Sequence, residues 1–170
     1  MINYIKGDLF SHIPMGNCSL ILAHACNPRG KWGAGIAKTF KSQYKSTFNI
    51  HETYCKTHDN LLGSSQLIKS DSTDLGNQPG HLPVYVACLF TADLGQKHTP
   101  EQIVKYTETS LQDLIKQLKQ SNQPFEQQDG KFVINMPKIN AGLFFTPWEM
   151  TEKVLNKFDQ DLIFNVYVLE

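Results

Sequence analysis

The segment His24–Ala37, HACNPRGKWGAGIA, combines glycines with side chains that could hold or transfer a phosphate. It contains Gly30, Gly33 and Gly35, together with Arg29, the only arginine of the chain. Glycines let a backbone approach a ligand closely, and the free N–H groups at the start of a following helix attract anions. The segment therefore predicts a strand-to-helix turn that cradles a phosphate or diphosphate, with a purely structural turn as the alternative.

Three known phosphate motifs are absent from this turn. No Gly-Lys-Ser/Thr follows it, so it is not a Walker A loop. Lys38 takes the place of the third glycine of the dinucleotide fingerprint. Arg29 comes too soon after Cys26 for the loop of a cysteine phosphatase, in which five residues separate the two. The turn thus predicts anion binding without one of these established chemistries.

A second loop, Asn140–Thr146 (NAGLFFT), also precedes a predicted helix and offers another anion-friendly helix start. Two such loops at one edge of a sheet would suit a diphosphate held between them. Phe144 and Phe145 could wall a sugar or a base, or could be core aromatics.

Composition limits the classes of partner. The chain has 170 residues, 41% of them hydrophobic, and a formal net charge of zero. These values predict one domain over residues 1–170 and indicate neither a nucleic acid nor a membrane as partner. We also expect a monomer that acts on a small-molecule substrate. No N-terminal apolar segment resembles a signal peptide, and the four cysteines match no disulfide framework. We expect a soluble cytoplasmic protein, which could also be nuclear.

No cofactor and no metal ion are predicted. His51, Cys55 and His58 would share one face of a predicted helix, and a zinc site can be imagined there, but no fourth ligand is within reach by sequence. Magnesium-dependent phosphoryl transfer would need paired carboxylates at a strand end, where Asp8 stands alone.

The remaining pattern alternates predicted strands with predicted helices. The strands are expected at 2–6, 19–25, 66–69, 83–90, 131–136 and 163–169, and the helices at 36–44, at 48–58, after a Thr99-Pro100 start and after a Thr146-Pro147 start. Both Thr-Pro starts are predicted helix caps. The order predicts an α/β fold, a three-layer α/β/α sandwich around a mixed, mostly parallel sheet of about six strands. Ligands bind beyond the carboxyl ends of such strands, so both loops should lie at one edge.

Short motifs in order along nearly the whole chain resemble the macrodomain family. They are Lys6-Gly7-Asp8-Leu9, His24-Ala25-Cys26-Asn27, Gly33-Ala34-Gly35-Ile36-Ala37, Cys88-Leu89-Phe90-Thr91, and Met136-Pro137-Lys138-Ile139-Asn140-Ala141-Gly142 with Pro147-Trp148. The nearest branch is the one that hydrolyses ADP-ribose 1″-phosphate. The resemblance implies ADP-ribose in a cleft at the edge of the sheet, and a link to by-products of tRNA splicing.

The resemblance also implies roles for residues. Asp8, flanked by Gly7 and Leu9, would receive the adenine amino group. His24, expected at the end of its strand, would be catalytic, and Asn27 would orient the distal ribose. The residues implied to hold the distal ribose and its phosphate, together with Asn27, are Trp32, Gly33, Ala34, Gly35, Ile36 and Ala37. Those implied to embrace the diphosphate are Asn140, Ala141, Gly142, Leu143, Phe144 and Phe145. Ala25, Cys26 and Thr146 are further candidates for binding the substrate.

Another branch of the family removes ADP-ribose from proteins or DNA bases with a lysine and an aspartate. The corresponding places here read Thr91-Ala92-Asp93 and Gly142-Leu143-Phe144. This departure favours a phosphatase, with a non-catalytic ADP-ribose-binding module and an ADP-ribosyl hydrolase as alternatives.

Three further residues are candidates of second rank. Arg29 could screen the terminal phosphate, because a guanidinium offers forked donors, and Lys31 would add its charge to the same screening. Asp93 and His98 lie in the loop that would border the cleft and could assist catalysis, or be a turn residue and a neighbour of a helix cap.

Overall fold

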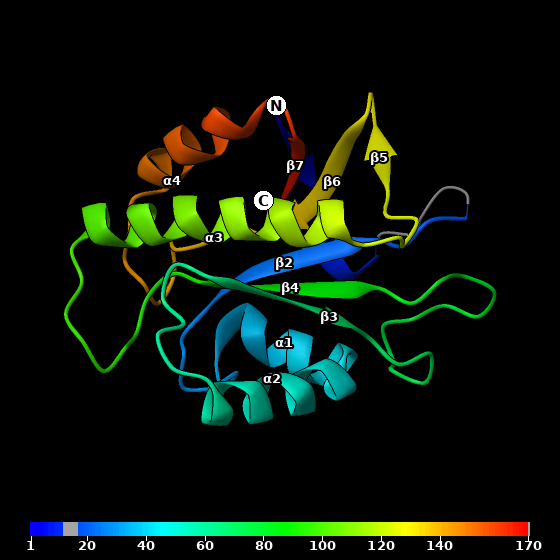
Figure 1. Cartoon of the computed structure of the whole chain (residues 1–170), viewed down its shortest axis with the longest axis horizontal. Helices are drawn as coiled ribbons and strands as arrows, with labels where there is room; N and C mark the ends of the chain where they lie inside the picture. Colours follow the sequence, from blue (N-terminus) through cyan, green and yellow to red (C-terminus); the bar gives the residue numbers. More distant parts are fainter. Residues whose placement is uncertain (12–16, 170) are drawn as a thin grey trace.

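The computed structural model describes residues 1–11 and 17–169 (Figure 1). Its strands are β1 (Ile2–Lys6), β2 (Ile21–Cys26), β3 (Ser65–Lys69), β4 (Tyr85–Phe90), β5 (Gln127–Gln128), β6 (Lys131–Met136) and β7 (Leu162–Val168). Its α-helices are α1 (Gly35–Gln43), α2 (Lys45–Thr57), α3 (Pro100–Gln120) and α4 (Trp148–Leu155), with short 3₁₀ helices η1 (Leu9–Ser11) and η2 (Asn156–Phe158).

The strands form one mixed sheet in the order β1-β7-β6-β2-β4-β3, with β5 paired to β6. The neighbours are parallel except at the β3–β4 and β5–β6 pairs. The predicted α/β class and mostly parallel sheet are confirmed. The sheet has one strand more than expected. The extra strand, β5, has only two residues, too few to show an alternation of polar and apolar side chains.

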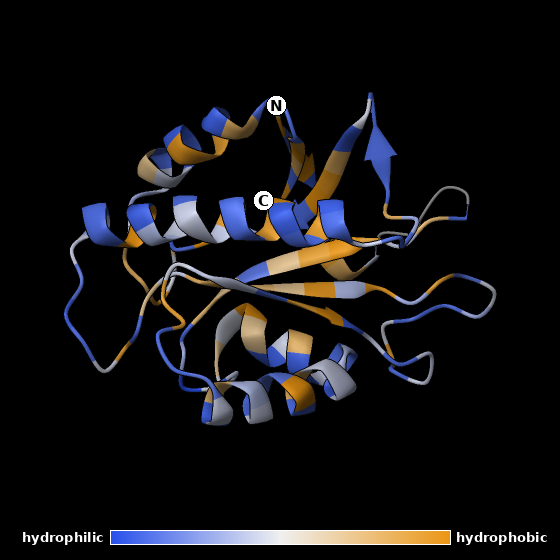
Figure 2. Ribbon diagram, in the orientation of Figure 1, coloured by the Kyte–Doolittle hydropathy of each residue, from blue (hydrophilic) through white to orange (hydrophobic). Residues whose placement is uncertain are grey.

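Helices cover both faces of the sheet (Figure 1). α1 and α2 lie on one face, whereas α3 and α4 lie on the other and contact each other. Every residue of β4 and all but one of β2 are buried, as two-sided cover requires. Figure 2 shows apolar strands between helices whose polar sides face outward. None of the described helices is both long enough and apolar enough to span a bilayer.

A crevice is expected between β2 and β6, which are neighbours in the sheet. The chain leaves β2 for α1 on one face and leaves β6 for α4 on the other (Figure 1). When the connections that follow two neighbouring strands go to opposite faces of the sheet, the loops diverge and leave a crevice beyond the carboxyl ends of the strands. The two predicted loops are these two connections.

The two Thr-Pro sequences behave differently. Thr99 forms the predicted capping box: its hydroxyl accepts a hydrogen bond from the N–H of Gln102, whose side chain accepts one from Thr99 N–H. The predicted cap at Thr146 is wrong. Its hydroxyl donates instead to the carbonyl of Phe144, and α4 begins after Pro147 with no side-chain cap.

Candidate active site

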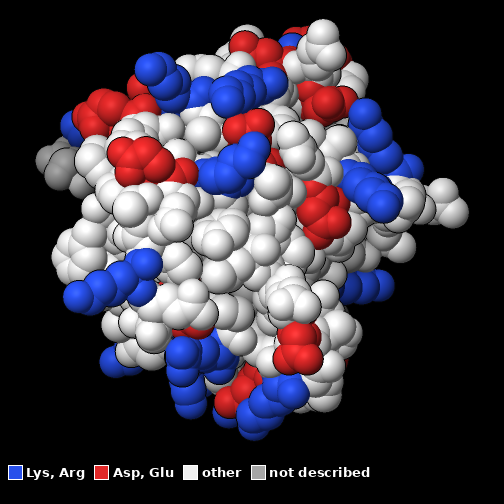
Figure 3. All heavy atoms as spheres, turned by 60° about the vertical axis from the view of Figure 1, so that its left-hand side comes forward, with Lys and Arg blue, Asp and Glu red and all other residues white. Residues whose placement is uncertain are grey.

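A cleft of about 670 Å³ opens at the carboxyl ends of β2 and β6. The Asn27–Gly35 turn and the Asn140–Phe145 loop both line it, so the prediction that they share one edge is confirmed. Figure 3 turns this side of the molecule forward and shows a largely uncharged central area with basic and acidic side chains around it. The predicted residues that line the cleft are Ala25, Cys26, Asn27, Trp32, Gly33, Ala34, Gly35, Ile36, Ala37, Asn140, Gly142, Leu143, Phe144 and Phe145.

Other predicted residues do not line the cleft. They are Gly7, Asp8, Leu9, His24, Arg29, Asp93, His98, Ala141 and Thr146. Asp8 is exposed, and its Oδ1 accepts a hydrogen bond from the N–H of Phe10 at 2.9 Å. It follows β1, which runs parallel to β7, so it emerges at the same edge of the sheet. Its contact with an adenine group stays a prediction.

The glycine turn leads directly into the N-terminus of α1. Gly35, the first residue of the helix, has φ +59°, a left-handed conformation that favours glycine. Ala34 precedes it and offers no side-chain cap. The N–H groups of the first helical turn have no partner within the helix and therefore suit an anion.

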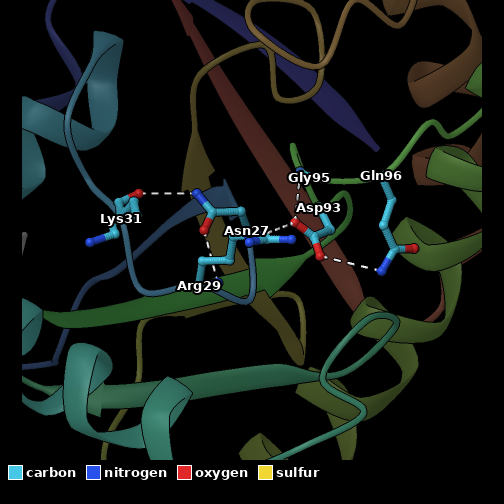
Figure 4. Close-up of polar contacts among 6 residues, drawn as sticks. All are labelled: Asn27, Arg29, Lys31, Asp93, Gly95 and Gln96. Atoms are coloured by element: carbon cyan, nitrogen blue, oxygen red, sulfur yellow. Dashed lines mark hydrogen bonds and ion pairs between the residues drawn. The ribbon is translucent and has the colours of Figure 1, made fainter.

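The side-chain amide of Asn27 holds this turn in shape (Figure 4). Its Oδ1 accepts a hydrogen bond from the N–H of Arg29 at 2.9 Å, and its Nδ2 donates to the carbonyl of Lys31 at 3.1 Å. Both groups of the amide are thus engaged within the turn. Asn27 lines the cleft, and its hydrogen bonds also fix the shape of the turn.

Arg29 joins the turn to the loop after β4 (Figure 4). Its Nε donates to Asp93 Oδ1 at 2.7 Å, and the Asp93 side chain is only 8% exposed. Burial of the Asp93 carboxyl raises its pKa, but the hydrogen bond from Arg29 and the N–H of Gly95 outweigh this, so that its pKa lies below the ordinary value. Arg29 therefore connects two loops at the rim, and its screening of a phosphate stays a prediction.

Gly95 offers a way to break this ion pair without removing either charge. A Cβ at Gly95 would lie 1.9 Å from Arg29 Nη2 and 2.4 Å from its Cζ, so the guanidinium must move away. We expect Gly95→Ala to lower the melting temperature at pH 7, as measured by circular dichroism.

The acid dependence tests the cause. Asp93, whose pKa is depressed in the folded state, contributes stability that is present above its unfolded pKa of about 4 and is lost as the pH falls. The difference between Gly95→Ala and wild type should therefore shrink on acidification below that pH. The difference in melting temperature between Asp93→Asn and wild type should shrink on acidification in the same way. If the difference between Gly95→Ala and wild type were as large at pH 3 as at pH 7, the effect of Gly95→Ala would have another cause than this ion pair.

The second loop rests on Asn140, which is 5% exposed and has φ +67°. Its Oδ1 accepts from the Thr91 hydroxyl at 2.8 Å, and its Nδ2 donates to Thr107 Oγ1 at 3.0 Å and to Thr151 Oγ1 at 3.3 Å. Thr146 N–H closes the loop on the Asn140 carbonyl at 2.9 Å. One buried amide thus connects the loop to the end of β4 and to two helices.

The charge of the cleft favours an anionic ligand. Lys31 and Lys138 line it, and no Asp or Glu does so within the described part of the chain. Phe145 is 83% exposed and has φ +49°, whereas Phe144 is half-buried. An aromatic ring held outward in a left-handed conformation offers an apolar wall beside a charged group.

The prediction that His24 lies at the end of its strand is wrong. β2 continues to Cys26, so His24 is not at the end of its strand. Its side chain is 1% exposed, stacks on Phe40 with ring centroids 4.1 Å apart, and meets Trp32 edge-on at 4.6 Å. Its ring nitrogens lie 3.5 and 3.7 Å from Cys26 Sγ. The imidazole therefore does not line the cleft, but it contacts Cys26 and Trp32, which do.

Besides Lys31, which was expected only to screen the phosphate, four residues of the cleft were not predicted to bind substrate: Leu94, Pro137, Lys138 and Ile139. Three of them directly follow β6, where the rule that ligands bind beyond carboxyl ends of strands could have found them. Leu94 is 57% exposed next to Asp93, and an exposed leucine in a loop carries no comparable signal.

His98 does not contact the cleft. Its ring meets Tyr106 edge-on at 5.6 Å, and its buried Nε2 has no hydrogen-bond partner in the structure. Its part in catalysis stays a prediction.

Comparison with known proteins identifies the family of the chain. The Macro domain family model matches residues 23–155. The ADP-ribose 1″-phosphate phosphatase of Meyerozyma guilliermondii is 51% identical, with 99% of this chain and 98% of that protein covered. The protein of the same name from Candida albicans is 50% identical, with 99% and 100% covered. The macrodomain of Mycobacterium tuberculosis DarG superposes with a TM-score of 0.72 at 23% identity, covering 100% of this chain and 99% of that one. The chain belongs to the Macro domain family.

Proposed function

We propose that this chain hydrolyses ADP-ribose 1″-phosphate to ADP-ribose and inorganic phosphate. The activity is the one named for the Meyerozyma and Candida relatives, which match essentially the full length of the chain. The observation that carries the proposal is the cleft itself. Two glycine-containing loops face it, two lysines line it, and no carboxylate among the described residues does. A sugar nucleotide with three phosphate groups matches that chemistry.

In the proposed complex, the terminal phosphate lies against the backbone from Gly33 to Ile36. N–H groups there and at the start of α1 would hold its oxygens and stabilise the charge that builds up in the transition state. The diphosphate would lie along Asn140–Phe145, with the two phenylalanines beside the distal ribose. Asp8 would accept the adenine amino group at the far end of the ligand.

The reaction exchanges one P–O bond for another. A water molecule attacks phosphorus, the bond from phosphorus to the sugar oxygen breaks, and the proton lost by the water replaces phosphorus on that oxygen. A group that moves this proton must reach the cleft. Cys26 lines the cleft and contacts His24, and we propose that His24 exchanges the proton through the Cys26 thiol.

The reaction class is tested by phosphate release from ADP-ribose 1″-phosphate, with chromatography of the nucleotide product. We expect stoichiometric ADP-ribose and phosphate from the purified chain. Calorimetry with ADP-ribose on the same sample separates the alternatives, because binding without release would make the chain a binding module. Release of ADP-ribose from a modified peptide or oligonucleotide, without action on the 1″-phosphate, would make it an ADP-ribosyl hydrolase.

The proton-transfer role is tested by His24→Gln, which keeps a planar polar side chain. We expect kcat to fall about 100-fold or more with little change in KM, because general acid–base catalysis contributes 10²–10⁴-fold. His58→Gln, at an exposed position after α2, is the matched control. Cys26→Ala should resemble His24→Gln, and a folded His24→Gln protein with wild-type kcat would exclude the role.

A further inference from the structure

We propose that His24, Cys26 and Cys88 form a buried site for one soft divalent cation such as Zn²⁺. Their ligand atoms all lie within 4.8 Å of one another. The three residues are 1%, 3% and 0% exposed, respectively. The prediction from sequence that the chain holds no metal did not consider this cluster, since it joins two strands that are far apart in the sequence.

The register of the sheet brings the three side chains together. His24 is paired with Cys88, and Cys26 with Phe90, across the parallel strands β2 and β4. His24 and Cys26 are two residues apart and so share one face of β2. The same face carries the core cluster that includes Cys26, Cys88, Trp32 and Phe40, under helices α1 and α2.

The spacing suits a metal better than a disulfide. Zinc bonds of about 2.3 Å to sulfur and about 2.0 Å to nitrogen, at a tetrahedral angle, place the two ligand atoms about 3.5 Å apart. Cys26 Sγ lies 3.5 Å from His24 Nε2. The two cysteines, by contrast, are free thiols in the structure.

The electrostatics of the cluster also favour a cation. Among the described residues, the ring nitrogens of His24 make a polar contact with the Cys26 sulfur alone, and sulfur is a weak partner for a buried imidazole. Two thiolates and Zn²⁺ have zero net charge, which limits the cost of burying them.

No fourth His, Cys, Asp or Glu joins the cluster in the described chain. Three protein ligands leave one coordination position for water or another small ligand, as in zinc sites with an open position. Binding would release one proton from each cysteine thiol to solvent. On the proposed function, it would also occupy both members of the Cys26–His24 pair, so zinc should inhibit phosphate release.

Cobalt titration of the reduced, chelator-treated full-length chain tests the site. We expect one equivalent of Co²⁺ to produce the visible bands of tetrahedral cobalt and a thiolate-to-cobalt charge-transfer band in the near ultraviolet. Zn²⁺ should abolish both by displacement. Cys88→Ser should lose the charge-transfer intensity, whereas the control variants Cys18→Ser and Cys55→Ser should keep it.

A folded wild-type chain without tetrahedral cobalt bands, or a Cys88→Ser protein with unchanged ones, would overturn the proposal. The Cys88→Ser fold is checked by its melting temperature and far-ultraviolet circular dichroism, and Cys26→Ser serves as the second variant. The spectrum does not depend on turnover. Phosphate release is measured on the metal-free chain, because a bound metal is expected to inhibit it. If cobalt binds and the metal-free chain releases no phosphate, the metal site stands and the phosphatase proposal fails; phosphate release by a chain that does not bind cobalt gives the reverse result.

Discussion

Gly33→Glu is expected to raise KM for ADP-ribose 1″-phosphate by about 10- to 100-fold while the protein stays folded. Gly33 is exposed, and a Cβ built on it meets no atom within 4 Å. Its φ is not in the left-handed region, so a side chain can be accommodated. A carboxylate about 6 Å from a phosphate charge costs about 1–3 kcal/mol, depending on the local dielectric constant. Phosphate-release kinetics and ADP-ribose calorimetry measure the effect.

Gly33→Gln is the matched control, because it has nearly the same shape without the charge. It should change KM far less than Gly33→Glu does. Raising the salt concentration should narrow the gap between the two variants, since partly exposed charges are screened. Equal KM values for the two variants would mean that no anionic group of the substrate lies at this turn.

Much of the architecture follows from local patterns. The run from Tyr85 to Phe90 is apolar throughout, and such a run is expected of a strand covered on both faces. The Thr99 capping box depends on residues three apart, so it was visible in the sequence. The placement of both loops at one edge follows from strand direction alone. These features need no knowledge of distant contacts.

The side chains of the site were harder to predict for a physical reason. A strand buried on both faces shows no alternation of polar and apolar residues, so the sequence of β2 cannot say which face His24 occupies. The Arg29–Asp93 ion pair joins residues 64 apart, and no local pattern signals it. Thr146 has the sequence of a cap, yet the tight loop before it supplies a nearer acceptor at Phe144. Tertiary context decided each case.

Asn140→Ala is expected to destabilise the chain by about 3 kcal/mol and to weaken ADP-ribose binding. The change removes the hydrogen bonds to Thr91, Thr107 and Thr151, each worth about 1 kcal/mol net, and leaves buried hydroxyls with fewer partners. Alanine also tolerates the left-handed backbone of this position less well than asparagine. Urea unfolding measures the stability, and calorimetry measures the loss of affinity that follows when the second loop is no longer held.

Asn122→Ala, at an exposed position after α3, is the control and should leave both quantities nearly unchanged. Asn140→Asp separates the parts of the network, because it keeps the acceptor for Thr91 but removes the amide that donates to Thr107 and Thr151. At low pH, where the acid is neutral, the free energy of unfolding of Asn140→Asp should lie between those of wild type and Asn140→Ala. At pH 7, where a charge must be buried, Asn140→Asp should be less stable than it is at low pH. A stability equal to that of the Asn122 control would show that the loop is positioned by its backbone alone, since the network would then contribute nothing to the shape of the cleft.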